Sequence, residues 1–128
     1  MRFNATGLCV LVLSLCGCVH PDYEKTLVNG YVLVRANSSE IFISNKERVV
    51  VVPGRITELG YVRDAIFGVV EIPYRQEPTK RSDFPDVVEG YFLIDTTRNV
   101  VELGLSKSAL SGQLNKMHVD SMTLERVD

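Results

Sequence analysis

Residues 49–72 read VVVVPGRITELGYVRDAIFGVVEI, and this stretch determines the fold class that the sequence predicts. It opens with four consecutive valines, whose β-branched side chains are stiff and favour strands. Pro53 and Gly54 end the run, as expected of a turn. Because the run is apolar without alternation, we expect a central strand that is buried on both faces.

Two more strands are predicted immediately after this turn, over residues 56–62 and 65–72. Arg63 and Asp64 separate them, and a two-residue connection is typical of a β-hairpin. Gly68 interrupts the second strand and indicates a bulge or the close approach of another backbone segment. Alternate residues share a face of a strand, and we expect one set in 65–72 to face the core: Ile66, Gly68, Val70 and Ile72.

The pattern of short strands and turns extends in both directions from this hairpin. Upstream, residues 31–35 and 40–44 flank a turn-forming stretch and predict another hairpin. Downstream, residues 87–95 alternate as a strand, residues 96–99 form a turn, and residues 100–103 return as its partner.

One helix is predicted near the C-terminus. Ser106 has a side chain that can cap a first helical turn, and Leu110, Leu114 and Met117 recur at helical spacing. Gly112 weakens this helix. The segment after it, around Met122 and Leu124 in the printed sequence, alternates and predicts a last short strand or extended segment.

These elements predict a mainly β, β-rich α+β fold. Parallel strands need long crossover connections, and the strands here follow one another without helices between them. We therefore expect an antiparallel meander of about seven strands, partly closed or sandwiched, with one short C-terminal helix covering one end.

The N-terminus has the features of a secretory signal peptide. Arg2 supplies a positive charge, and residues 8–15 form a nearly continuous apolar run that we expect to be helical. A helix of this length covers only about half of the ~30 Å hydrocarbon core of a bilayer. The run is therefore interpreted as a signal rather than as a permanent membrane span.

The end of that run, Leu15-Cys16-Gly17-Cys18, resembles the lipobox of bacterial lipoproteins. Cys16 and Cys18 each follow a leucine three residues upstream, but only Cys18 is preceded by a small residue, as that family requires. The resemblance implies cleavage between Gly17 and Cys18, a thioether-linked diacylglycerol on Cys18, and palmitate or another acyl chain on its amino group. The alternative is an ordinary cleaved signal peptide with an incidental cysteine.

This interpretation divides the chain into a signal peptide (1–17), a lipidated tether (18–29) and a single β-rich domain (30–128). All three cysteines lie at or before position 18, so the domain has no disulfide. Val19 stands where enteric lipoproteins retained in the inner membrane carry aspartate. The resemblance therefore implies a lipid anchor in the cell membrane, and in a Gram-negative organism the outer membrane, facing the periplasm.

The distribution of charge argues against some functions, and few residue patterns in the sequence indicate catalysis or ligand binding. The 14 basic and 16 acidic residues are interspersed, which argues against a nucleic-acid partner. His118 and Asp120 lie close together in the sequence, and segment 83–89 contains the acidic residues Asp83, Asp86 and Glu89. Neither group has the further ligands or the nucleophile that a metal site or a triad needs. We expect no catalytic residue, no metal and no cofactor, and hence no enzyme.

The long interruption at residues 73–85 is the predicted recognition surface. Tyr74 and Phe84 flank the basic residues Lys80 and Arg81, and tyrosine in particular supplies rigid contact area to protein partners. We therefore expect a membrane-anchored, non-enzymatic module that binds an envelope protein, for example an immunity protein against a secreted toxin. The alternatives are a structural or assembly component of an envelope machine and, less favoured, a small hydrolase.

Two strand sequences add a mild preference for the same class. Residues 30–33 (Gly-Tyr-Val-Leu) and 91–95 (Tyr-Phe-Leu-Ile-Asp) resemble strands of small uncharacterised bacterial lipoproteins. The resemblance implies β-rich structure and no particular activity.

Overall fold

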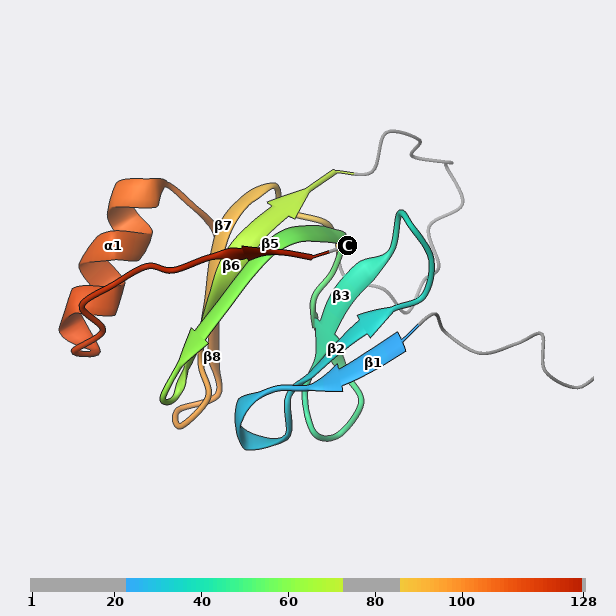
Figure 1. Cartoon of the computed structure of the whole chain (residues 1–128), viewed down its shortest axis with the longest axis horizontal. Coiled ribbons are helices and arrows are strands. Elements are labelled where there is room, and N and C mark those ends of the chain that lie inside the picture. The colour runs from blue at the N-terminus through green and yellow to red at the C-terminus, as the bar shows by residue number, and fades with distance from the viewer. Residues whose placement is uncertain (1–22, 73–85, 128) are drawn as a thin grey trace, which may run out of the picture.

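The computed structural model describes residues 23–72 and 86–127, and these form a mainly β fold (Figure 1). Nine strands build one mostly antiparallel open sheet within the described residues, with one short α-helix near the C-terminus. The predicted mainly β fold class with one short helix is confirmed. The described sheet has nine strands rather than about seven, and it is open rather than partly closed or sandwiched. The elements are β1 (Tyr23–Thr26), the 3-10 helix η1 (Val28–Gly30), β2 (Val32–Arg35), β3 (Ile41–Ser44), β4 (Val50–Val52), β5 (Arg55–Val62), β6 (Ala65–Glu71), β7 (Gly90–Asp95), β8 (Val100–Leu105), α1 (Lys107–Lys116) and β9 (Glu125–Arg126).

The strands follow the order β1-β2-β3-β5-β6-β7-β8, so most neighbours in the sheet are also neighbours in the sequence. The three predicted hairpins, β2–β3, β5–β6 and β7–β8, are all present and antiparallel. Among the described strands, the one parallel pairing joins Ile41 of β3 to Arg55 of β5. This single residue pair connects the two halves of the sheet.

The valine run does not form a central strand, and that prediction was wrong. Only Val50–Val52 is a strand, β4, and it pairs with β3 alone, off the main strand order. Val49 is 56% exposed, and only Val52 is fully buried. The physical reason is that β4 and β5 pair with the same edge of β3. Strand β4 is therefore short and lies beside the main strand order. Four β-branched residues indicate a strand but not its place in the sheet.

The sheet begins earlier than the sequence indicates. Strand β1 lies inside the segment 18–29 that the sequence predicts to be a tether, and it pairs with β2 along its full length. From Tyr23 onward that part of the prediction was wrong. The strand lies at the edge of the sheet and three of its four residues are exposed, so it lacks the alternation that identifies a half-buried strand.

Two hydrophobic cores lie on opposite faces of the central strands. The larger core brings together residues from both halves of the sheet, among them Ile43 of β3, Ile66 of β6 and Phe92 of β7. The second core lies beneath α1 and includes Phe67 of β6 and Leu93 of β7. Strands β6 and β7 are therefore the ones buried on both faces.

The predicted core face of β6 is only partly correct. Ile66 and Val70 are buried as expected, but Ile72 is 42% exposed and lies beyond the strand. Phe67, assigned by the sequence to the opposite face, is fully buried because the helix covers it. Gly68 lies where another backbone approaches, since a Cβ there would contact the Glu58 carbonyl oxygen of β5.

The C-terminal region confirms the predicted helix and short last strand. Ser106 caps α1 by accepting a hydrogen bond from the Ala109 amide at 3.1 Å, and Leu110 and Leu114 are buried against the sheet. After the helix the chain returns across the molecule, and β9 pairs antiparallel with β5 at Glu58 and Leu59 (Figure 1). No helix in the described part of the chain is both long and apolar enough to cross a bilayer.

Candidate functional site

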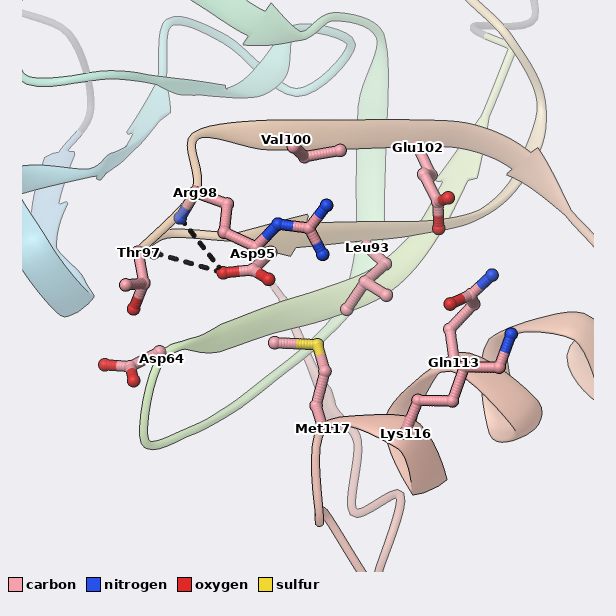
Figure 2. A pocket seen from close by; sticks show the side chains of 10 residues that line it. All are labelled: Asp64, Leu93, Asp95, Thr97, Arg98, Val100, Glu102, Gln113, Lys116 and Met117. Carbon is pink, nitrogen blue, oxygen red and sulfur yellow. Dashed lines mark hydrogen bonds between the residues drawn. The ribbon is translucent and has the colours of Figure 1, made fainter.

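A cavity of about 440 Å³ opens between the C-terminal end of α1 and the face of β7 and β8 that the helix covers (Figure 2). We call it the helix cleft. It is lined by Asp64, Leu93, Asp95, Thr97, Arg98, Val100, Glu102, Gln113, Lys116 and Met117. The cleft therefore combines residues from the β5–β6 turn, the β7–β8 hairpin and the helix.

The cleft has an apolar floor. Leu93 of β7 belongs to the core beneath α1 and is only 4% exposed, and Met117 at the end of the helix packs against the same core. Val100, at the start of β8, is 40% exposed. An apolar surface thus continues from the second core outward into the cleft.

Charged side chains surround this floor. Asp95 ends β7, and its Oδ1 accepts hydrogen bonds from the backbone amides of Thr97 and Arg98, both at 3.2 Å. These bonds fix the β7–β8 turn in the way an aspartate commonly does. From this turn the Arg98 side chain extends over the floor toward Glu102, and Lys116 lies on the helix side (Figure 2).

A second group of polar contacts holds the same turn to the N-terminal half of the chain. Asn29 donates its Nδ2 to Thr96 Oγ1 at 2.8 Å and, over a longer 3.4 Å, to Asp64 Oδ1. Thr96 is buried, and its hydroxyl donates to the Asp64 carbonyl oxygen at 2.7 Å. Asn29 has a positive φ of 52°, a conformation that asparagine tolerates better than most residues. The η1 segment and the two turns are thereby joined.

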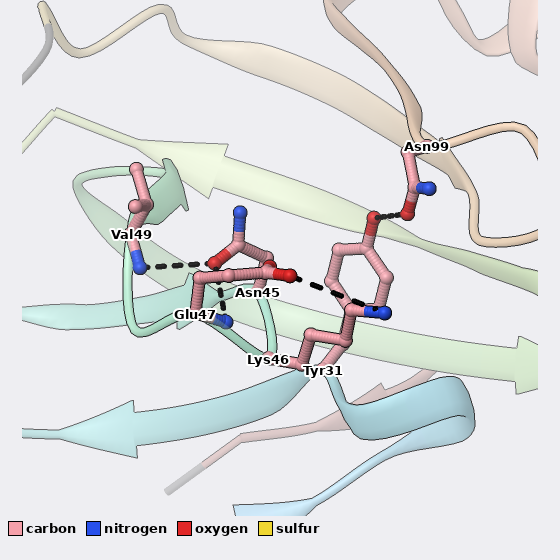
Figure 3. A network of polar contacts seen from close by, with 6 residues as sticks. All are labelled: Tyr31, Asn45, Lys46, Glu47, Val49 and Asn99. Atoms are coloured by element: carbon pink, nitrogen blue, oxygen red, sulfur yellow. Dashed lines mark hydrogen bonds and ion pairs between the residues drawn. The ribbon is translucent and has the colours of Figure 1, made fainter.

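Tyr31 makes another link to this turn (Figure 3). Its ring is buried, and its hydroxyl donates to Asn99 Oδ1 at 2.9 Å. Burial raises the pKa of Tyr31 above its ordinary value of 10.0, and the negative charges of Glu47 and Asp95 raise it further. The tyrosine is therefore a neutral hydrogen-bond donor at physiological pH.

Hydrogen bonds from backbone amides to an asparagine side chain fix the turn between β3 and β4. Asn45 Oδ1 accepts from the backbone amides of Glu47 and Val49, both at 3.0 Å (Figure 3). Lys46 pairs with Glu47 at 3.9 Å, and both side chains are largely exposed. This exposed pair adds little stability. Glu47 in this turn is one of the negative charges that raise the pKa of Tyr31.

The residues singled out by sequence lie mostly outside the described part of the chain. This holds for the lipidation and cleavage residues Gly17 and Cys18, and for the predicted recognition residues Tyr74, Lys80, Arg81 and Phe84. Among the described candidates, His118, Asp120, Asp86 and Glu89 are all exposed. No group of three or more potential metal ligands forms within residues 23–72 and 86–127.

The helix cleft itself was not predicted from the sequence. Residues 96–99 were assigned only to a turn, and Arg98 carries no local signal that distinguishes it from other surface arginines. Asp95 was the one indication, since an aspartate that ends a strand often fixes the following turn. The cleft depends on α1 packing beside this turn, which is a tertiary feature.

Comparison with known proteins adds no relative from which to argue. No protein family, curated protein or solved structure matches this chain.

Proposed function

We propose that the protein is a lipid-anchored component of the bacterial cell envelope that binds a protein partner through the helix cleft. The sequence Leu15-Cys16-Gly17-Cys18 supports the anchor, and the cleft supports the binding activity. The two parts of the proposal are tested separately.

The observation that carries the binding activity is the composition of the helix cleft. Its apolar floor of Leu93, Val100 and Met117 is surrounded by charged side chains, among them Arg98. Protein interfaces have an apolar centre within a polar rim, and methionine and arginine are enriched in them. A partially exposed apolar surface next to arginine therefore favours a protein contact.

The anchor is tested by labelling with palmitate in the bacterium. The full-length protein is expected to incorporate the label and to fractionate with membranes, and Cys18→Ser is expected to lose both properties. Cys16→Ser is the matched control, because it removes the neighbouring thiol and leaves the proposed lipidation site intact. Labelled, membrane-bound Cys18→Ser protein would show that the anchor is assigned to the wrong residue.

The binding activity is tested by affinity capture from envelope extract with the lipidated protein. We expect a specific partner that Lys107→Glu retains and Arg98→Glu loses. Both residues are exposed cations, but Lys107 lies at the opposite end of α1 and does not line the helix cleft. Equal capture by both variants would exclude the cleft as the binding surface, and no specific capture by the wild type would refute the binding module.

A further inference from the structure

Asn29 is followed directly by Gly30, and this pair has a chemical reactivity that the proposed function does not use. The backbone nitrogen of the residue after an asparagine can attack the side-chain carbonyl carbon of that asparagine. Glycine hinders this attack least, because it has no Cβ. Asn29 is the only asparagine in the printed sequence that precedes a glycine. It is therefore the asparagine most susceptible to deamidation.

The reaction needs only the Asn29-Gly30 pair and water. The Gly30 nitrogen forms a bond to the side-chain carbonyl carbon of Asn29, and the side-chain nitrogen leaves as ammonia with the Gly30 amide proton. The product is a cyclic imide, a succinimide. Water then opens the succinimide at one carbonyl to give aspartate, or at the other to give isoaspartate. Both products carry a carboxylate and have lost the amide donor.

The fold holds the reacting atoms apart. Asn29 has a φ of 52° and a ψ of 38°. At this ψ, the Gly30 nitrogen and the Asn29 Cβ point in nearly opposite directions about the bond between Cα and the carbonyl carbon, whereas ring closure requires them on the same side. The side-chain amide is also held, because Nδ2 donates to Thr96 Oγ1 at 2.8 Å and to Asp64 Oδ1 at 3.4 Å. The attack therefore requires η1 to open first.

We propose that Asn29 is a deamidation site that is controlled by the opening of η1 from the β7–β8 turn. Asn29 and Gly30 are both exposed, so η1 can open locally while the core stays folded. The hydrogen bond to Thr96 opposes this opening. The rate of deamidation therefore follows the fraction of molecules in which that bond is broken.

Deamidation changes the contacts of η1 permanently. A carboxylate at position 29 cannot donate to Thr96 Oγ1, whose own proton is already donated to the Asp64 carbonyl oxygen. The new carboxylate also lies near the Asp64 carboxylate, which repels it. The modification thus removes one of the side chains that fasten the start of the sheet to the turn carrying Arg98. This inference goes beyond the proposed function and does not depend on it.

The first test follows the peptide containing Asn29 by mass spectrometry, using the full-length protein in detergent at mildly alkaline pH. The peptide is expected to convert slowly to its aspartate and isoaspartate forms in the folded protein, and faster in concentrated urea, which unfolds the chain. Equal rates in the two conditions would show that the fold does not protect the site. An unmodified peptide in urea would refute the site itself.

The second test separates local opening from global unfolding. Thr96→Val is expected to accelerate deamidation of Asn29 about two- to tenfold, the factor that corresponds to the net contribution of one hydrogen bond. Ile56→Val is the matched control, since it destabilises the protein through the loss of one fully buried methylene in the larger core and leaves the Asn29 contacts intact. Equal acceleration by both variants, or none by Thr96→Val, would overturn the control by local opening.

The third test reproduces one product genetically. Asn29→Asp is expected to lower the urea midpoint, because the carboxylate repels Asp64 and no longer donates to Thr96. The double variant Asn29→Asp with Asp64→Asn is expected to recover part of the loss, since the amide and the carboxylate then exchange places. A single variant as stable as the wild type, or a double variant without recovery, would show that deamidation does not release η1 from the turn.

Discussion

Tyr31, just before β2, donates its hydroxyl hydrogen to Asn99 Oδ1 in the β7–β8 turn, across 2.9 Å and 68 positions of sequence. Asn29 makes a second bond to the same turn through Thr96. The beginning of the sheet is thereby fastened to the turn that carries Arg98. The shape of the helix cleft consequently depends on residues near the start of the described chain.

Tyr31→Phe is expected to lower the free energy of unfolding by about 1 kcal/mol, because it removes one partly buried hydrogen bond and leaves the Asn99 oxygen without it. Urea denaturation measures the change. Tyr61→Phe is the control, since Tyr61 is 43% exposed and keeps its ring near Lys25. An equal effect of the two substitutions would contradict a specific role for the Tyr31 hydroxyl.

Alkaline pH is expected to destabilise the wild type more than Tyr31→Phe. Burial, followed by the charges of Glu47 and Asp95, raises the pKa of Tyr31 in the folded state above 10.0. The folded protein therefore holds the phenolic proton at a pH where the unfolded chain has released it. The resulting stability is complete below pH 10 and is lost as the pH rises through the folded-state pKa.

Unfolding free energies measured from pH 8 to pH 11 check this expectation. The difference between the wild type and Tyr31→Phe is expected to be constant at the lower end and to shrink above about pH 10, the ordinary tyrosine pKa. Parallel curves over the whole range would show that the hydroxyl titrates normally.

Thr96→Val is expected to cost about 1–2 kcal/mol of stability, because it removes two part-buried hydrogen bonds that the threonine hydroxyl makes. The Asp64 carbonyl oxygen loses a bond of 2.7 Å, and Asn29 loses an acceptor at 2.8 Å. Valine has nearly the same shape, so packing is conserved. Thr97→Val, at the exposed neighbouring position, is expected to change stability little, and chemical denaturation of both variants distinguishes the two.

The sequence predicted correctly the features that depend on residues close together in the chain, and it missed features that depend on distant residues. The β5–β6 hairpin was predicted because two residues, Arg63 and Asp64, determine its turn, and Arg63 indeed adopts a positive φ of 55°. Helix α1 was predicted from its cap at Ser106 and its spaced leucines. These features depend on residues close in sequence.

The errors concern features that depend on distant residues. The position of Val50–Val52 depends on β4 and β5 sharing an edge of β3, and the pairing of Tyr23–Thr26 depends on β2. The cleft residues Arg98 and Lys116 are brought together only when the helix packs on the sheet. No local sequence pattern indicates such a contact.

Alanine substitutions at two glycines compare the tight packing between the central strands with the open surface of the helix. A Cβ at Gly68 would contact the Glu58 carbonyl oxygen and lie 2.9 Å from the ring of Phe92, whereas a Cβ at Gly112 would have nothing within 4 Å. Gly68→Ala is therefore expected to destabilise the protein by about 3 kcal/mol through overpacking between β5 and β6.

Gly112→Ala is expected to have the opposite sign. Its site is exposed and helical, and alanine favours the helix by about 1 kcal/mol relative to glycine. Thermal and urea unfolding of the two variants provide the comparison, with the same chemical change made at both positions. If the Gly68→Ala protein were as stable as the wild type, β5 and β6 could not be held at this separation. The added methyl group would then fit without displacing the Glu58 carbonyl group or the Phe92 ring.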